Sequence, residues 1–283
     1  IIDKIYRPYD NLNLLVLMEP DGTLQKKVVA SVSESLVGDT SREKHWKRLE
    51  DIFKKKSLQM ASFTVTEKGY SLTDILGNYL PDVINDFKMR PKSPKHLISK
   101  VSALAYIRYK NGKLPIAFVS MDNCSHNGDV LKNAIFTIVK NWIQNGHVES
   151  GFLEYLNDPE KVSFPWTMID KITPRPSEKI KDDLNDIGFK STKIHCTDKN
   201  TFIAPFVNAE VPQYLVIEDH FPNGRMPLEL VGVLFTDRKT VDMVERMKVT
   251  TCLNPLHTAL AVFGCLLDYK LIADEMQDKH LKK

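Results

Sequence analysis

Apolar and polar residues alternate along the chain in two rhythms, one typical of β-strands and one typical of amphipathic helices. Residues 11–18 and 26–33 are β-rich, and the turn-forming residues 19–22 between them predict a hairpin or two neighbouring strands. Apolar side chains recur at helical spacing over residues 41–55, and residues 58–66 have the composition of a buried strand. Together these segments predict a strand–helix–strand unit.

A second group of segments surrounds residues 114–120, which are apolar enough to form a central strand of a parallel sheet. This run ends in a polar cluster, residues 121–129. Ligands of open α/β sheets gather beyond the carboxyl ends of the strands, so the cluster is a predicted ligand site. Helices are predicted around it over residues 72–87 with a break at Pro81, 99–107 and 130–145.

From Thr240 the pattern is helical to the end of the chain, and we place a domain boundary near Asp237. The strands and helices before the boundary are typical of a nucleotide-binding α/β domain with a mostly parallel sheet. No GxGxxG, GxGxxxG or GxxxxGK(S/T) motif occurs, so spacing alone does not identify a cofactor. The remaining predicted elements before the boundary are a short apolar segment at 164–174, a helix at 177–187 and strands at 214–217 and 230–235.

The stretch 245–258 places a lysine, an asparagine and a histidine in an otherwise apolar run. A buried lysine loses its proton more readily, which makes Lys248 a candidate base. In a straight helix Asn254 and His257 would lie about 240° and about 180° around the axis from Lys248. Because Pro255 does not fit a helix interior and asparagine favours helix starts, we expect a break, kink or π-bulge before Pro255, with a second helix beginning at or near Asn254. The alternative is a solvated helix-end lysine and a simple asparagine cap.

Composition excludes several classes of function. The 39 basic and 36 acidic residues nearly balance, so charge gives no reason to expect a nucleic-acid or membrane partner. No apolar run reaches the roughly 18–20 residues that span a bilayer, and no signal peptide pattern is present. The four cysteines lack disulfide or CxxC spacing, which favours a cytoplasmic protein. A zinc site at His195 and Cys196 stays open as a minor alternative, and we expect no metal.

Five segments stand out in order along the chain: 64–70, 120–129, 164–174, 218–225 and 245–257. Together they resemble motifs of the polyol-specific long-chain dehydrogenases, the mannitol dehydrogenase family. The resemblance implies a Rossmann-like dinucleotide-binding domain over residues 1–237 and the beginning of an α-helical substrate domain over residues 238–283. It also implies that the glycine-rich fingerprint of the family lies before Ile1 and much of the helical domain after Lys283, so that the chain is a fragment. One departure is that five residues separate Lys248 from Asn254, whereas the common form has four.

The resemblance assigns a catalytic set. Lys248 is implied as the general base, Asn254 and His257 as ligands of the substrate oxygens, and Glu245 as the acid that relays the proton to solvent. Asn127 is implied as a second amide that stabilises the oxyanion next to the cofactor, although a simple turn asparagine is the alternative. A base for the hydroxyl proton and donors for the alkoxide are what hydride transfer from a secondary alcohol requires.

Substrate and cofactor contacts are implied in the same way. Asp170 would touch the substrate or position its neighbours, the alternative being a surface acid paired with Lys171. Asn123 is a further expected substrate contact, and Arg175, Lys171 and Arg225 are candidate cations for a substrate carboxylate. Asp10 would be an acid near the adenosine ribose, which favours NAD over NADP. The alternative is that Asp10 is a simple turn aspartate. The residues expected near the cofactor are Asp10, Thr66, Glu67 and Asn127.

The leading hypothesis is therefore an NAD-dependent enzyme that interconverts a ketohexuronate and a hexonate, of the D-fructuronate/D-mannonate type, without a metal. The form of residues 164–171 is closer to the uronate reductases of the family than to its mannitol dehydrogenases. A mannitol or arabinitol 2-dehydrogenase is the alternative enzyme, and a non-catalytic dinucleotide-binding protein is the second alternative. We expect a monomer or small homo-oligomer.

Overall fold

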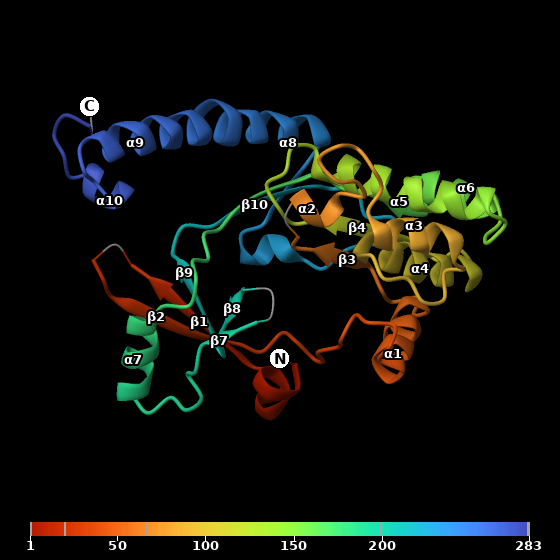
Figure 1. Ribbon diagram of the computed structural model, residues 1–283, viewed down its shortest axis with the longest axis horizontal. Coiled ribbons are helices and arrows are strands. Elements are labelled where there is room, and N and C mark those ends of the chain that lie inside the picture. The colour runs from red at the N-terminus through yellow and green to blue at the C-terminus, as the bar shows by residue number, and fades with distance from the viewer. Residues whose placement is uncertain (1, 20, 66, 198–199, 282–283) are drawn as a thin grey trace.

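The computed structural model describes residues 2–19, 21–65, 67–197 and 200–281. Three three-stranded sheets and one two-stranded sheet are surrounded by helices (Figure 1). The sheets have the strand orders β2-β1-β9, β3-β4-β5, β11-β10-β6 and β7-β8. The strands are β1 (Asn13–Met18), β2 (Leu24–Val29), β3 (Met60–Phe63), β4 (Ile116–Ser120), β5 (Val162–Ser163), β6 (Thr167–Asp170), β7 (His195–Cys196), β8 (Phe202–Ile203), β9 (Phe206–Glu210), β10 (Tyr214–Glu218) and β11 (Leu234–Thr236).

The helices confirm most of the predicted positions. Near the amino terminus a π-helix (Ile2–Tyr6) and a 3-10 helix (Arg7–Tyr9) precede β1, and a second 3-10 helix (Leu228–Val231) precedes β11. The α-helices are α1 (Glu43–Phe53), α2 (Glu67–Tyr70), α3 (Pro81–Lys88), α4 (Leu97–Lys110), α5 (Asn127–Gln144), α6 (Gly151–Asn157), α7 (Glu178–Asp186), α8 (Arg238–Glu245), α9 (Asn254–Leu266) and α10 (Ile272–Glu275), with the π-helix η4 (Arg246–Leu253) between α8 and α9.

Strand β4 is the centre of the largest core. All five of its residues are buried, and β3 and β5 pair with it in parallel. Its side chains pack with those of α4 and α5, which contribute five and six buried hydrophobic residues to this core. The prediction of a central parallel strand over residues 114–120 is confirmed, and the strand end faces the polar cluster that follows it.

Two predictions about local elements were wrong. Residues 72–80 are not helical, and α3 begins at Pro81, because a proline disfavours helical geometry in the residue before it. Residues 230–235 do not form one strand, because the 3-10 helix ends at Gly232 with φ +90° and only then does β11 begin.

The expected strand–helix–strand unit is also absent from the described residues. Strands β1 and β2 form the predicted hairpin, in which Met18 pairs with Leu24, but β3 lies in another sheet. Strand β2 has lysines at Lys26 and Lys27 and is largely exposed, so it suits a sheet edge. The parallel partner of β1 is β9, which comes much later in the chain.

The last helices form one continuous run over residues 238–266. Asp237 caps its start by accepting a hydrogen bond from the Thr240 N–H, and the domain division at 237 stays a prediction. By length and composition this run could cross a membrane, and only 6% of its most apolar 18-residue stretch is buried in the structure. The expectation that no apolar run is long enough to span a bilayer was therefore wrong. The helical run is not interrupted at Asn254 and Pro255, because η4 leads directly into α9. Length and composition alone are weak grounds for a membrane partner.

Candidate active site

A cavity of about 1000 Å³ lies at the carboxyl ends of β3, β4 and β6, and residues of α8, η4 and α9 form its opposite wall. This is where open α/β sheets bind ligands. The predicted ligand cluster supplies part of the wall, from Met121 to Ser125. Six residues expected in the site line the cavity: Asn123, Asp170, Lys171, Glu245, Asn254 and His257.

The π-helix η4 sets the positions of Lys248, Asn254 and His257. The predicted irregularity is confirmed, since η4 ends at Leu253 and α9 begins at Asn254. Asn254 does not act as a side-chain cap, because Leu253 occupies the N-cap position without a side-chain bond. Asn254 and His257 both line the main cavity, so the two residues share one face as expected.

Lys248 lies in an adjoining cavity of about 350 Å³, which Asp170 and His257 also line. Its Nζ is 3.4 Å from Asp170 Oδ2 and 4.1 Å from the centroid of the Tyr214 ring. The expectation of a buried lysine was wrong, because 42% of the side chain is exposed. Its described partners are Asp170 at the end of β6 and Tyr214 at the start of β10, and the rest of the side chain reaches solvent.

Asn127 has a different place from the expected one. Its side chain is fully buried and is absent from the residues that line the cavity. Its Nδ2 donates to the Asp122 carbonyl at 3.0 Å and to Thr167 Oγ1 at 2.9 Å, and its Oδ1 accepts from the Thr167 N–H at 3.1 Å. The amide is therefore committed to joining the start of α5 to β6 and does not reach a substrate oxygen in this structure.

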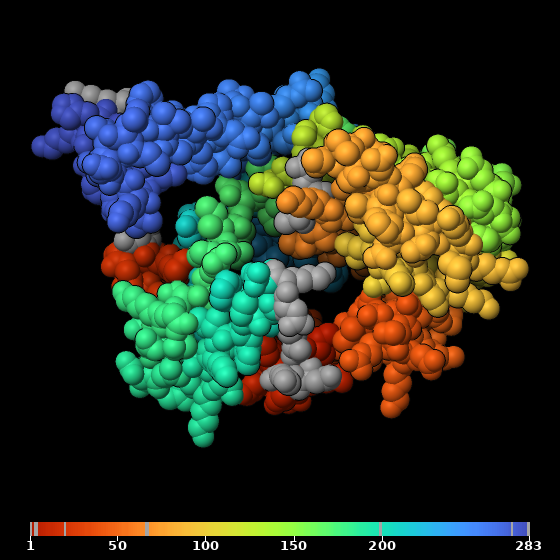
Figure 2. Space-filling model, viewed as in Figure 1, coloured from red at the N-terminus to blue at the C-terminus, as the bar shows by residue number. Residues whose placement is uncertain are grey.

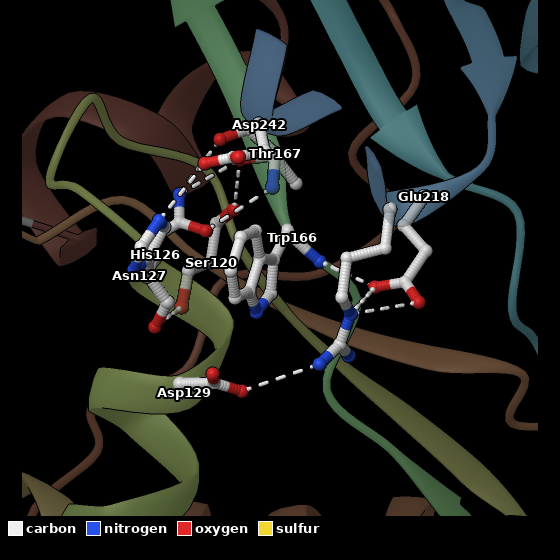
Figure 3. A network of polar contacts seen from close by, with 9 residues as sticks. Ser120, His126, Asn127, Asp129, Trp166, Thr167, Glu218 and Asp242 are labelled. Carbon is white, nitrogen blue, oxygen red and sulfur yellow. Dashed lines mark hydrogen bonds and ion pairs between the residues drawn. The ribbon is translucent and has the colours of Figure 1, made fainter. Parts of the chain in front are cut away.

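Glu245 is buried at the cavity wall, 5% exposed, and its Oε2 accepts a hydrogen bond from the His126 N–H at 3.1 Å. His126 has a left-handed backbone with φ +50°. Its ring stacks on Trp166, with the centroids 4.1 Å apart, and its Nε2 is 3.0 Å from Asp242 Oδ1 (Figure 3). Sequence reasoning missed His126 and Trp166 as site residues, although both lie inside segments that carry the family resemblance.

A second missed pair joins the last residue of α2 to the segment after β4. The Tyr70 hydroxyl donates to Asp122 Oδ2, and the Cys124 N–H donates to Asp122 Oδ1 at 2.9 Å. Burial, together with the bond to Asp122, raises the pKa of Tyr70, so the phenol stays protonated as a donor. Asp122 itself lines the cavity, and the pair therefore fixes its wall.

The three candidate cations for a substrate carboxylate lie in different parts of the structure. Arg175 is exposed, stacks over the Phe202 ring at 4.8 Å and does not line the main cavity. Arg225 pairs with Asp219 and Glu229 instead. Lys171 does line the cavity; its Nζ donates to the Glu210 carbonyl, and burial lowers its pKa.

The expected cofactor contacts are spread along the chain. Asp10 is exposed just before β1, with φ +52°, and does not line the cavity. Thr66 lies outside the described residues, whereas its neighbours Thr64 and Val65 line the cavity. Glu67 is the first residue of α2. Within the described part of the chain, no group of three or more His, Cys, Asp or Glu side chains suits a metal ion.

Comparison with known proteins identifies the family. Residues 9–229 match the family model described as the mannitol dehydrogenase Rossmann domain. The chain belongs to the mannitol dehydrogenase family. This confirms the resemblance and the Rossmann-type α/β fold. The catalytic set implied at 245–257 lies beyond the matched residues, and its roles remain predictions.

Members of the mannitol dehydrogenase family resemble the whole chain. A D-mannonate oxidoreductase of Thermotoga maritima is 54% identical over 100% of the chain and 52% of the relative. The structure of a substrate-free D-sorbitol dehydrogenase has a TM-score of 0.81 at 25% identity, covering 98% of this chain and 52% of that one. Pseudomonas fluorescens mannitol 2-dehydrogenase, solved with NAD and D-mannitol, has a TM-score of 0.74 at 28% identity, covering 97% and 51%. The chain thus spans about half the length of the curated relatives it matches.

Proposed function

We propose that the chain forms part of an NAD-dependent oxidoreductase that interconverts a ketohexuronate and a hexonate, of the D-fructuronate/D-mannonate type. The observation that carries the proposal is the meeting of Lys248, Asp170 and His257 in one cavity next to the main one. The 54% identity to a D-mannonate oxidoreductase supports the choice of a sugar acid.

The cavity fits the reacting end of a dinucleotide together with a sugar acid. Its volume of about 1000 Å³ lies at the upper end of the range for small-molecule sites. Thr64, Val65 and Asn123 line it at the strand ends and would hold the nicotinamide side. NAD, when bound, accepts or returns the hydride of a secondary alcohol. Asp10 is the residue we propose for the preference of NAD over NADP.

The residues of the chain account for the proton in the same reaction. In the oxidising direction Lys248 Nζ takes the hydroxyl proton, and in the reducing direction it returns that proton to the carbonyl oxygen. Asp170, at 3.4 Å, holds the ammonium form in place. Asn254 and His257 offer donors to the oxygen on which charge develops, and Glu245 is the acid proposed to pass the proton onward.

A cation is needed to recognise a carboxylate. Among the described residues that line the main cavity, Lys171 is the lysine or arginine present, and of the three candidate cations it is the one we propose for this role. Its position supports a sugar acid as the substrate. The alternative, a mannitol or arabinitol 2-dehydrogenase, is favoured by the structural likeness to mannitol 2-dehydrogenase, which was solved with D-mannitol.

The test is the initial rate of NADH oxidation by the complete gene product, with D-fructuronate and D-fructose side by side and with NADPH as a second coenzyme. We expect D-fructuronate and NADH to be preferred. Lys248→Ala should lower kcat by about 10²- to 10⁴-fold, the usual contribution of acid–base catalysis, and leave NADH binding unchanged. A preference for D-fructose would favour the polyol dehydrogenase, and NADH binding without turnover would favour the non-catalytic alternative. Near-normal turnover by Lys248→Ala would refute the base assignment.

A further inference from the structure

His126 connects the end of the central sheet to the helix that leads into the proposed catalytic set. Its Nε2 is 3.0 Å from Asp242 Oδ1, and its backbone N–H donates to Glu245 Oε2 at 3.1 Å. A carboxylate only accepts hydrogen bonds, so Nε2 carries the proton in the first contact. Both contacts reach α8, at positions three residues apart and hence on one face of the helix.

Trp166 extends this contact to the first residue of α8. The indole stacks on the His126 imidazole at an interplanar angle of 20°, and the Arg238 guanidinium lies 4.9 Å from the indole. Glu218 Oε2 accepts from the backbone N–H of Trp166 at 3.1 Å, and the same carboxylate accepts from Arg238 Nε at 3.0 Å. The two ends of α8 are therefore held against one stack of rings (Figure 3).

Helix α8 continues directly into η4, so a change in the direction of α8 is passed on to the residues of η4. Val241 is completely buried in the middle of α8, packed with residues of β6 and β10. A change in the tilt of α8 would therefore shift Lys248 relative to Asp170, which lies at the end of β6. Small misplacements of a catalytic group cost about 10²-fold in rate.

We propose that His126 is a positioning residue for the proton transfer: its ring, stacked on Trp166 and bonded to Asp242, fixes α8 and thereby the places of Glu245 and Lys248. This inference rests on the proposed function, since it concerns the same site. His126 has φ +50°, a left-handed conformation in which asparagine, aspartate and histidine are the commonest residues after glycine. The backbone therefore admits asparagine as well as histidine, and the ring contacts give a reason for the histidine.

The test is His126→Asn in the complete gene product. Asparagine tolerates φ +50°, so the variant removes the ring with little added backbone strain. We expect kcat to fall by about 10- to 100-fold with an unchanged KM for NADH, and the solvent deuterium isotope effect on kcat to rise because proton transfer becomes slower. Hydrogen exchange of residues 238–245 should become faster, whereas exchange of α5 beyond its first turn should stay the same.

Three further variants make the result decisive. His126→Gln keeps a donor for Asp242 but removes the ring, so it should recover only part of the rate lost in His126→Asn, and Asp242→Asn should reproduce part of the loss from the other side of the contact. His147→Asn is the matched control, because His147 bonds the Lys88 carbonyl and does not line the cavity. Unchanged kcat and unchanged exchange in His126→Asn would overturn the inference while the parent enzyme stays active. An inactive parent would overturn the proposed function, and the exchange of α8 would then decide whether His126 holds the helix.

Discussion

At the scale of single residues, the segment that follows β4 is held by hydrogen bonds and by close packing of the backbone. Both the nitrogen and the oxygen of the Asn127 side chain are hydrogen-bonded, to Asp122 and to Thr167. These bonds hold the start of α5 against the start of β6. The next residue is Gly128, and a Cβ there would lie 2.4 Å from the Phe164 carbonyl oxygen and 2.9 Å from that of Pro165. The close approach of two backbones explains why a residue without a side chain follows Asn127.

Gly128→Ala should therefore destabilise the fold by about 1–3 kcal/mol, because backbone atoms must move to admit the methyl group. Urea unfolding followed by circular dichroism measures the free energy of unfolding. Gly38→Ala is the control, since a Cβ at Gly38 meets nothing within 4 Å. Equal stabilities for the two variants would show that α5 does not approach the segment 164–166 this closely.

The scale of elements shows what a local pattern predicts and what it does not. The irregularity before Pro255 was predicted correctly, because the conformational limits of proline are local and appear as η4. The pairing of β1 with β9 was not predicted, because a strand chooses its parallel partner by distant contacts. The same limit applies to the site. The residue types around Lys248 were found from the sequence, but its exposure depends on which elements cover η4.

Glu149, just before α6, bonds two side chains of α4, which makes this part of the contact between the helices sensitive to pH. Glu149 accepts from the Tyr106 hydroxyl at 2.7 Å and from Lys110 Nζ at 3.0 Å. The Tyr106 hydroxyl, then the bonds of the Glu149 backbone and of Lys110, lower the pKa of Glu149 from 4.5 to about 2. A carboxyl with a lowered pKa in the folded state stabilises the fold above its unfolded pKa, and this stabilisation is lost as the pH falls through the folded pKa.

Glu149→Gln keeps an acceptor for Tyr106 and removes the charge. Because 43% of the Glu149 side chain is exposed, solvent screens the pair, and the expected loss at pH 7 is about 0.2–1 kcal/mol. The difference between wild type and variant should shrink between pH 4.5 and about pH 2, the window given by the two pKa values. Urea unfolding at pH 7, 4.5 and 3 measures it. A difference that stays constant down to pH 3 would contradict the assignment of the stabilisation to the Glu149 charge.

At the scale of the whole molecule, apolar surface is unevenly distributed. The side chains around β4 are almost completely buried, whereas α9 runs along the upper edge of the molecule, away from that core (Figures 1 and 2). Leu256, Leu260, Phe263 and Leu267 recur at helical spacing and form one apolar stripe. Phe263 is 56% exposed and Leu267 57% exposed. Contiguous apolar surface of this kind on a soluble chain promotes association.

The 283-residue chain should therefore self-associate through the α9 stripe, because burial of apolar area between copies is favourable at about 25 cal/mol per Å². The double variant Phe263→Lys/Leu267→Lys should shift sedimentation velocity profiles towards the monomer at equal protein concentration. Ile75→Lys/Leu76→Lys is the matched control, since both side chains are exposed on a separate loop. Equal association of the two variants would mean that exposed apolar residues act one by one, and a monomeric parent chain would mean that the stripe is too small to hold two copies together.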